Sequence, residues 1–135
     1  MKKTANYLVL FVVSSILGWA INTFGIYLAG GKYAQSTFLP YFSLIFGISS
    51  IVLILFFKHI KTHKILHIFG GIILVNLIEL IGGILCRNVF KKEYWNYSSH
   101  FMNFNGYISL QQSVYWIILV SLFYYIYIKK LKKFF

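Results

Sequence analysis

Four long apolar segments dominate this sequence, at residues 7–28, 38–57, 65–85 and 107–128. Each is close to the roughly 20 residues that an α-helix needs to cross a bilayer. Only 11% of the 135 residues are charged, whereas about a quarter are charged in an average soluble domain. We therefore predict an all-α, polytopic membrane protein. It has one membrane domain over residues 1–135, four transmembrane helices and an outer loop at 86–106.

The first apolar segment follows Met1-Lys2-Lys3 and could therefore imitate a secretory signal peptide. It is too long for the apolar part of such a peptide, and no small-residue cleavage motif follows it. We interpret it as a transmembrane helix.

The net charge of +11 is distributed unevenly between the two sides of the predicted domain. Nine of the basic residues fall on the side of the two chain ends, and four on the opposite side. The positive-inside rule then places both termini in the cytoplasm, in a multi-pass protein of the plasma or inner membrane. Lysine clusters there attract anionic lipid head groups, and no soluble module is present to bind nucleic acid. The nine are Lys2, Lys3, Lys58, Lys61, Lys64, Lys129, Lys130, Lys132 and Lys133.

Glu79 is the only acidic residue inside the apolar segments. A carboxylate near a helix centre costs roughly 2.5–3.5 kcal/mol on insertion, so such a group usually faces a partner, a cavity or a substrate. At 1.5 Å per residue, amides of the first and fourth segments lie at a similar depth, about 6–9 Å below the outer edge of the hydrocarbon. The candidate polar pocket comprises Glu79, Asn22, Asn76, Gln111, Gln112 and Ser113.

Two interpretations of this polar layer stay open. Either Glu79 lies in a small chamber that opens outward, where it pairs with Asn22 or Gln112 or binds a cationic or amide-bearing substrate group, or the polar groups only hydrogen-bond one another and hold the helices together. Small residues at intervals of three or four also follow one face of the first two segments, which favours close helix packing. They include Ser14, Gly18, Gly25, Ser43, Gly47 and Ser50.

His59, His63 and His67 recur at every fourth position, a spacing at which two imidazoles can share a metal ion. No carboxylate or thiolate stands nearby to complete such a site, so an ordinary cytoplasmic interface is the other interpretation. Cys86 is the only cysteine, which excludes an internal disulfide. We predict no metal, no cofactor and no catalytic residue.

A specific motif runs from Glu79 to Trp116. A membrane glutamate is followed four positions later by glycine, then by W-N-Y-S and N-F-N-G in a loop, then by a hydroxyl residue and a tryptophan. The residues are Glu79, Gly83, Trp95, Asn96, Tyr97, Ser98, Asn103, Asn105, Gly106, Ser113 and Trp116. This pattern resembles the type IV ABC-transporter permease family, also called CmpB-like integral membrane proteins. The resemblance implies a separate ATPase subunit, because the chain has no G-x-x-x-x-G-K-[ST] phosphate loop.

The chain departs from that family in charge. Acidic residues usual in the family are replaced by Asn22, Arg87 and Asn96, and a basic one by Tyr107. This weakens mechanisms that need paired carboxylates. In the loop, tryptophan and tyrosine suit the membrane interface, the amides are predicted to cap the fourth helix or close over the chamber, and Gly106 is predicted to open that helix.

We therefore predict an integral subunit of a transport or export system, with an outer-leaflet polar pocket around Glu79. Its partners would be copies of itself, a separate permease chain or an ATPase, together with membrane lipids. One alternative is a membrane-embedded enzyme that acts on a lipid or lipid-linked substrate, with Glu79 as general acid or base. The other is a non-catalytic structural or immunity-type membrane protein.

Overall fold

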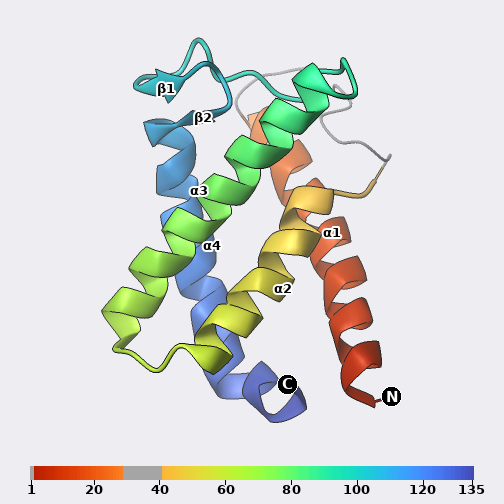
Figure 1. Ribbon diagram of the computed structural model, residues 1–135, viewed down its shortest axis with the longest axis vertical. Coiled ribbons are helices and arrows are strands. Elements are labelled where there is room, and N and C mark those ends of the chain that lie inside the picture. The colour runs from red at the N-terminus through yellow and green to blue at the C-terminus, as the bar shows by residue number, and fades with distance from the viewer. Residues whose placement is uncertain (1, 29–40) are drawn as a thin grey trace.

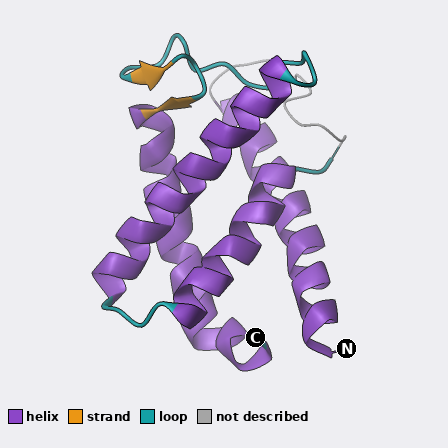
Figure 2. Cartoon of the chain, viewed as in Figure 1, coloured by secondary structure: helices purple, strands orange, loops and turns teal. Residues whose placement is uncertain are grey.

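The computed structural model describes residues 2–28 and 41–135, except for the side chains of 26–28. Four helices follow the long axis of the molecule (Figure 1). They are α1 (Lys2–Leu28), α2 (Leu44–His59), α3 (Lys64–Asn88) and α4 (Leu110–Ile126). A π-helical turn, η1 (Tyr127–Leu131), and a 3-10 turn, η2 (Lys132–Phe134), continue α4. Figure 2 shows how far helix dominates: the two strands of the described part are two residues each, which confirms the predicted helical class.

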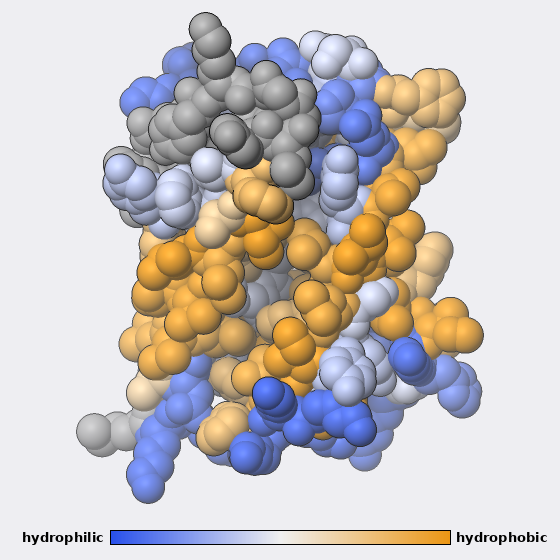
Figure 3. Space-filling model, turned by 180° about the vertical axis from the view of Figure 1, so that it is seen from behind, coloured by the Kyte–Doolittle hydropathy of each residue, from blue (hydrophilic) through white to orange (hydrophobic). Residues whose placement is uncertain are grey.

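Three of the helices are long and apolar enough to cross a membrane, namely α1, α3 and α4 with its continuation. A helix satisfies its backbone hydrogen bonds within itself, as a segment in lipid must. With 16 residues, α2 is shorter. Its length of about 24 Å falls below the roughly 30 Å of a hydrocarbon core. On the face seen in Figure 3, an apolar band separates two hydrophilic ends.

The second helix begins later than predicted. The sequence predicts a span over 38–57, of which 38–40 lie outside the described residues, and the helix starts at Leu44. Ser43 before it is extended, with φ −100° and ψ 102°. Its N–H donates to the carbonyl of Ser15 in α1 at 2.9 Å. The first turn of α2 therefore lies beside the middle of α1 rather than beside its end.

The centre of the molecule is an apolar core between α2, α3 and α4. A Cβ atom on Gly71 of α3 would lie 2.9 Å from Val120 and 3.0 Å from Leu53. Glycine thus allows these helices to approach closely, which matters in lipid because packing contacts drive helix association there. The buried apolar side chains are Leu53, Ile54, Phe57, Val75, Trp116, Val120 and Tyr127.

Small residues mediate the contact between α1 and α2. The ring of Phe46 lies where a Cβ atom of Gly18 would be, and the Ser15 hydroxyl lies where a Cβ atom of Gly47 would be. Larger side chains at these two glycines would separate the helices. The predicted stripe of small residues therefore forms part of this interface.

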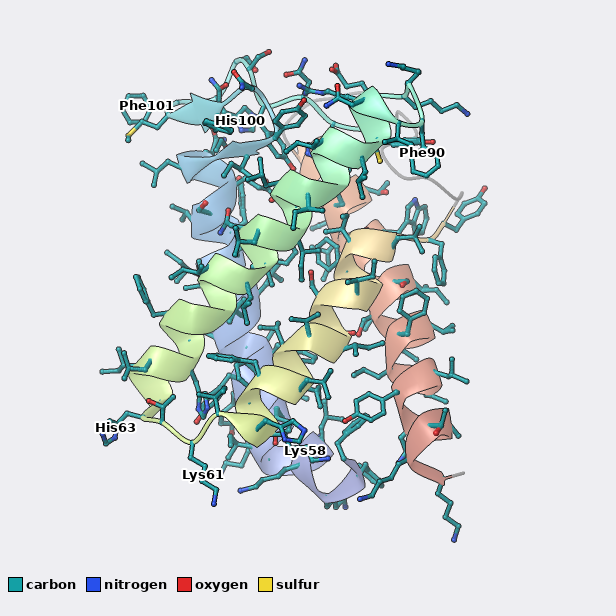
Figure 4. The ribbon with its side chains drawn as sticks, viewed as in Figure 1. Lys58, Lys61, His63, Phe90, His100 and Phe101 are labelled. Carbon is teal, nitrogen blue, oxygen red and sulfur yellow. The ribbon has the colours of Figure 1, made fainter. Side chains whose placement is uncertain are left out.

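The two chain ends lie at the same end of the molecule (Figure 1). Lys58, Lys61 and His63 are found at this end in Figure 4, beside the α2–α3 turn. We call it the lysine end, formed by residues 2–3, 58–64 and 129–133. The opposite end, the loop end, is formed by residues 89–109. The predicted outer loop at 86–106 falls mostly here, although α3 extends to Asn88 before the loop begins.

A short hairpin forms part of the loop end. Strand β1 (Asn103–Phe104) pairs antiparallel with β2 (Ile108–Ser109). Between them, Asn105 and Gly106 have φ values of 48° and 73°. A type I′ turn requires positive φ at both central positions and therefore favours Asn-Gly. The prediction that Gly106 opens the fourth helix is wrong, because this glycine is needed for the turn.

The fourth helix starts with a side-chain cap. Ser109 is extended, and its Oγ accepts a hydrogen bond of 3.0 Å from the N–H of Gln112. A serine in this position satisfies one of the free N–H groups of the first turn. The helix therefore begins at Leu110, three residues after the predicted start at 107.

Candidate functional site

Glu79 lies inside the helix bundle, near the loop end of α3. Its side chain is 4% exposed. The indole Nε1 of Trp116 on α4 donates to Oε2 at 2.9 Å. The hydroxyl of Tyr97 in the loop donates to Oε1 at 2.8 Å. Both carboxylate oxygens are therefore held, and neither donor is one of the two amides that the sequence predicts as partners.

Tyr97 reaches Glu79 because the loop folds back over the end of α3. The Tyr97 N–H donates to the carbonyl of Gly106 at 2.8 Å, and its ring stacks on His100 with centroids 5.0 Å apart. Burial, and then the negative charge of Glu79, raise the pKa of the Tyr97 phenol far above its ordinary value. The hydroxyl consequently remains a hydrogen-bond donor to the carboxylate through the neutral and mildly alkaline range.

Arg87 at the end of α3 holds the rest of this loop in place. Its Nη1 donates to the carbonyl of Asn105 at 2.7 Å, and its Nη2 donates to the carbonyl of Trp95 at 3.3 Å. Its Nε lies 2.9 Å from Oε2 of Glu93, and the guanidinium lies 4.3 Å from the centroid of the Tyr107 ring. A planar guanidinium suits several partners at once, so this one side chain contacts four residues of the loop.

Trp95 packs against α3 at Gly83, the glycine that follows Glu79 in the sequence motif. A Cβ atom on Gly83 would lie 2.8 Å from the ring of Tyr107 and 3.3 Å from that of Trp95. The Trp95 Nε1 also donates to the Tyr107 carbonyl at 3.0 Å. The absence of a side chain at Gly83 therefore lets two aromatic rings of the loop lie directly on the helix, one turn above Glu79.

A cavity of about 370 Å³ opens beside Glu79. Its wall includes the first turns of α2, the outer turns of α3, the loop and α4. Because α2 begins only at Leu44, its N-terminal residues border this space. Of the predicted pocket residues, Glu79, Asn22 and Gln112 line the cavity, from α3, α1 and α4 respectively.

The other predicted pocket residues lie elsewhere. The Ser113 hydroxyl lies 2.8 Å from Oδ1 of Asn76 and 2.9 Å from the carbonyl of Ser109, and its single hydrogen can serve one acceptor at a time. The Asn76 amide donates to the Ile72 carbonyl at 2.9 Å. These two groups link α3 to α4, and neither lines the cavity. Gln111 is exposed at the start of α4.

The polar residues of the loop serve mainly to build it. The Asn96 amide donates to Oε1 of Glu93, and its Oδ1 accepts from the Ser98 N–H, each at 2.9 Å. Oδ1 of Asn103 accepts from the Gly106 N–H at 3.0 Å. The prediction that the loop amides cap α4 is wrong for Asn103, since the cap is the hydroxyl of Ser109.

The three histidines at intervals of four do not share one helix face. His59 ends α2 and His63 precedes α3, and both are exposed, whereas His67 is buried against Phe57 and other rings. Among the described residues, no three His, Cys, Asp or Glu side chains are grouped so as to hold a metal ion. Cys86, a free thiol, lines the cavity.

Sequence reasoning did not single out several aromatic residues of the cavity wall. Phe46, Phe90 and Tyr94 line it together with Trp95, Tyr97 and Trp116. Because 21% of this chain is aromatic, no local signal separates these rings from lipid-facing ones. The cap at Ser109 and the Asn105-Gly106 turn, in contrast, carry recognisable sequence signals.

Comparison with known proteins adds one finding. The family model described as "Putative ABC-transporter type IV" matches residues 9–135, which is nearly the whole chain. No curated protein and no solved structure matches the chain.

Proposed function

Because the chain belongs to this family of type IV ABC-transporter proteins, we propose that it is an integral subunit of a transport or export system. The cavity around Glu79 would be its substrate site. The observation that carries this proposal is a buried carboxylate that borders an open space while both of its oxygens are oriented by donors. A structural group with no further role would not need the adjoining cavity.

The loop end would face the outside of the cell, so that the cavity lies in the outer leaflet. Lysine clusters support this orientation, because positively charged connections stay on the cytoplasmic side. The same lysine end would contact anionic lipid. In this orientation α2 would reach only part of the way from the cytoplasmic side, and its first turn would form the floor of the cavity.

The subunit would act with partners. Four helices, one of them short, enclose only about 370 Å³ beside Glu79. A pathway across the membrane therefore requires either further copies of the chain or a separate permease subunit. ATP would be hydrolysed by another chain, because this sequence has no phosphate-binding loop.

The test is the ATP hydrolysis of the assembly that forms around this chain. A tagged full-length chain is purified from its own membranes and placed in liposomes made from the lipids of that membrane. We expect a nucleotide-hydrolysing subunit to co-purify. In Glu79→Gln the assembly should persist while its hydrolysis rate falls by roughly tenfold or more, because charge-assisted hydrogen bonds worth about 1.5–3 kcal/mol each are weakened.

Glu93→Gln is the matched control, since Glu93 is the other acid of the chain and lies in a half-exposed ion pair with Arg87. Its hydrolysis rate should stay within about twofold of the native rate, as exposed pairs contribute little. An assembly without ATPase activity would overturn the transport proposal. Loss of the assembly itself in Glu79→Gln would show that this residue only holds the helices together.

A further inference from the structure

We propose that the cavity binds an amphiphile with a positively charged ammonium head group, and that its alkyl chain lies in a crevice between α1 and α4. This inference rests on the proposed function, because it names the substrate class of the same site. It follows from three features: an unbalanced charge, the aromatic composition of the cavity wall, and a second, apolar space next to the first.

Glu79 is the acidic side chain of the cavity wall, and no cation of the described part of the chain pairs with it. The ion pair found there joins Arg87 to Glu93 at 2.9 Å. The guanidinium of Arg87, the one arginine in the sequence, is therefore already paired with another acid. No lysine, arginine or histidine of the described residues forms an ion pair with Glu79. A cationic ligand would supply this missing partner, whereas an anionic one would be repelled.

The hydrogen bonds of Glu79 leave its carboxyl group able to accept more. An indole N–H can only donate, so Oε2 must accept from Trp116. Oε1 accepts from the Tyr97 hydroxyl. A carboxylate offers about four acceptor sites, and these two bonds use one on each oxygen. The remaining sites are available to an ammonium N–H or to the polarised methyl groups of a quaternary ammonium.

Aromatic rings form much of the cavity wall. A cation within about 6 Å of a ring centroid is attracted to the face of the ring, and this attraction grows when water is removed. A carboxylate among aromatic rings therefore favours an alkylammonium head group over a sugar or a simple alcohol, because only the ammonium carries a positive charge that both the carboxylate and the ring faces attract. The rings are those of Phe46, Phe90, Tyr94, Trp95, Tyr97 and Trp116.

A second space of about 180 Å³ lies on the lysine-end side of the first and opens between α1 and α4. Its wall is apolar apart from three serines, and Phe46 and Trp116 border both spaces. Their ring centroids are 5.0 Å apart. Figure 3 looks onto this side of the molecule, where the apolar band is hollowed near its middle. An alkyl chain could pass over these two rings from the cavity into the crevice.

The direct test compares two probes that differ in charge alone. Dodecyltrimethylammonium is titrated against the uncharged isostere in which carbon replaces the nitrogen, with the full chain in an uncharged maltoside detergent. Fluorescence of Trp95 and Trp116, which line the cavity, reports binding. We expect the cation to bind roughly 30-fold more tightly. Equal affinities for the two probes would overturn the proposal, and this comparison needs no variant.

Variants then assign the charge preference to one residue. Glu79→Gln should reduce the preference for the cation to about threefold or less, whereas Glu93→Gln should keep it within about twofold of the native value. Circular dichroism and gel filtration establish that both variants are folded. A preference that persists in folded Glu79→Gln would place the cation elsewhere and refute the assignment.

The place of the alkyl chain has its own test. Ser14 borders the crevice, so Ser14→Trp should fill it and lower the affinity for dodecyltrimethylammonium about tenfold, while binding of tetramethylammonium stays unchanged. Leu8→Trp is the control, because Leu8 lies on α1 outside the crevice and is 62% exposed. Equal effects of the two tryptophans would exclude the crevice as the chain site.

These results separate the inference from the proposed function. If the probes do not discriminate but the assembly hydrolyses ATP in a Glu79-dependent way, the transport role stands and the ligand class is wrong. If the probes discriminate while no ATPase accompanies the chain, the binding site exists and the transport role is wrong.

Discussion

The indole Nε1 of Trp116 donates a 2.9 Å hydrogen bond to Oε2 of Glu79, a residue 37 positions earlier in the chain. Both side chains are nearly inaccessible, at 3% and 4% exposure. The bond joins α4 to α3 at the depth of the cavity. It therefore links the stability of the bundle to the orientation of the carboxylate.

Trp116→Phe removes this donor while keeping an aromatic ring in place. We expect a loss of about 2 kcal/mol in the free energy of unfolding, because a buried carboxylate oxygen is left without its partner. Chemical unfolding in detergent measures it. Trp19→Phe is the control: Trp19 packs edge-on against the exposed ring of Tyr41 and does not line the cavity, and we expect a change below about 0.5 kcal/mol. Similar losses in both variants would contradict a special role for the bond.

Tyr97 makes the free energy of unfolding depend on pH in the alkaline range. Its pKa is raised in the folded protein by burial and by the charge of Glu79, whereas an unfolded tyrosine ionises near about pH 10. The contribution is complete below that value and is lost as the pH rises above it, since only the unfolded chain releases the proton. In Tyr97→Phe the unfolding free energy should be lower at neutral pH and should fall less steeply above about pH 10. Parallel profiles would refute this.

Gly106 should not tolerate a side chain. Its φ is +73°, and a Cβ atom would collide with Oδ1 of Asn96 and lie 3.1 Å from Nη2 of Arg87. We expect Gly106→Ala to cost about 1–3 kcal/mol and to make the loop sensitive to limited proteolysis. Gly25→Ala is the control, because no described atom lies within 4 Å of its added Cβ atom. Gly25 lies in the last turn of α1, where the change should stabilise by up to about 0.5–1 kcal/mol. A native-like loop in Gly106→Ala would contradict the expectation.

The orientation in the membrane can be read from the accessibility of single thiols. With Cys86 replaced by serine, the chain has no cysteine, so Ser99→Cys and Lys61→Cys each introduce one exposed thiol, at opposite ends of the molecule. In intact cells a membrane-impermeant maleimide should label the cysteine at 99 and not the one at 61. The reverse pattern would invert the topology.

The helical segments were predictable because each depends on local composition. Long apolar runs with few charges identify membrane helices, and the helices found at 2–28, 64–88 and 110–126 overlap three of the four predicted spans closely. The second span was wrong at its start, since the extended backbone at Ser43 depends on a hydrogen bond to α1. A contact with a distant residue leaves no pattern in the local sequence.

The candidate site was predictable in its centre and not in its surroundings. A lone glutamate in an apolar helix stands out in any reading, because the energetic cost of burying it is large. Its hydrogen-bond partners were less predictable, because many polar groups lie at one depth in the membrane. Depth alone does not define the direction in which each side chain points from its helix. Ser113 illustrates this, as it lies near the level of Glu79 yet pairs with Asn76.

The sequence alone indicated a helical membrane protein whose two ends differ in charge. It also indicated one carboxylate in need of partners. Each of these depends on composition and spacing along the chain. Only the tertiary structure decided that Tyr97 and Trp116 hold that carboxylate and that a cavity opens beside it. The donors are 18 and 37 positions away, so their meeting depends on the fold of the loop and on helix packing, which act across the whole molecule.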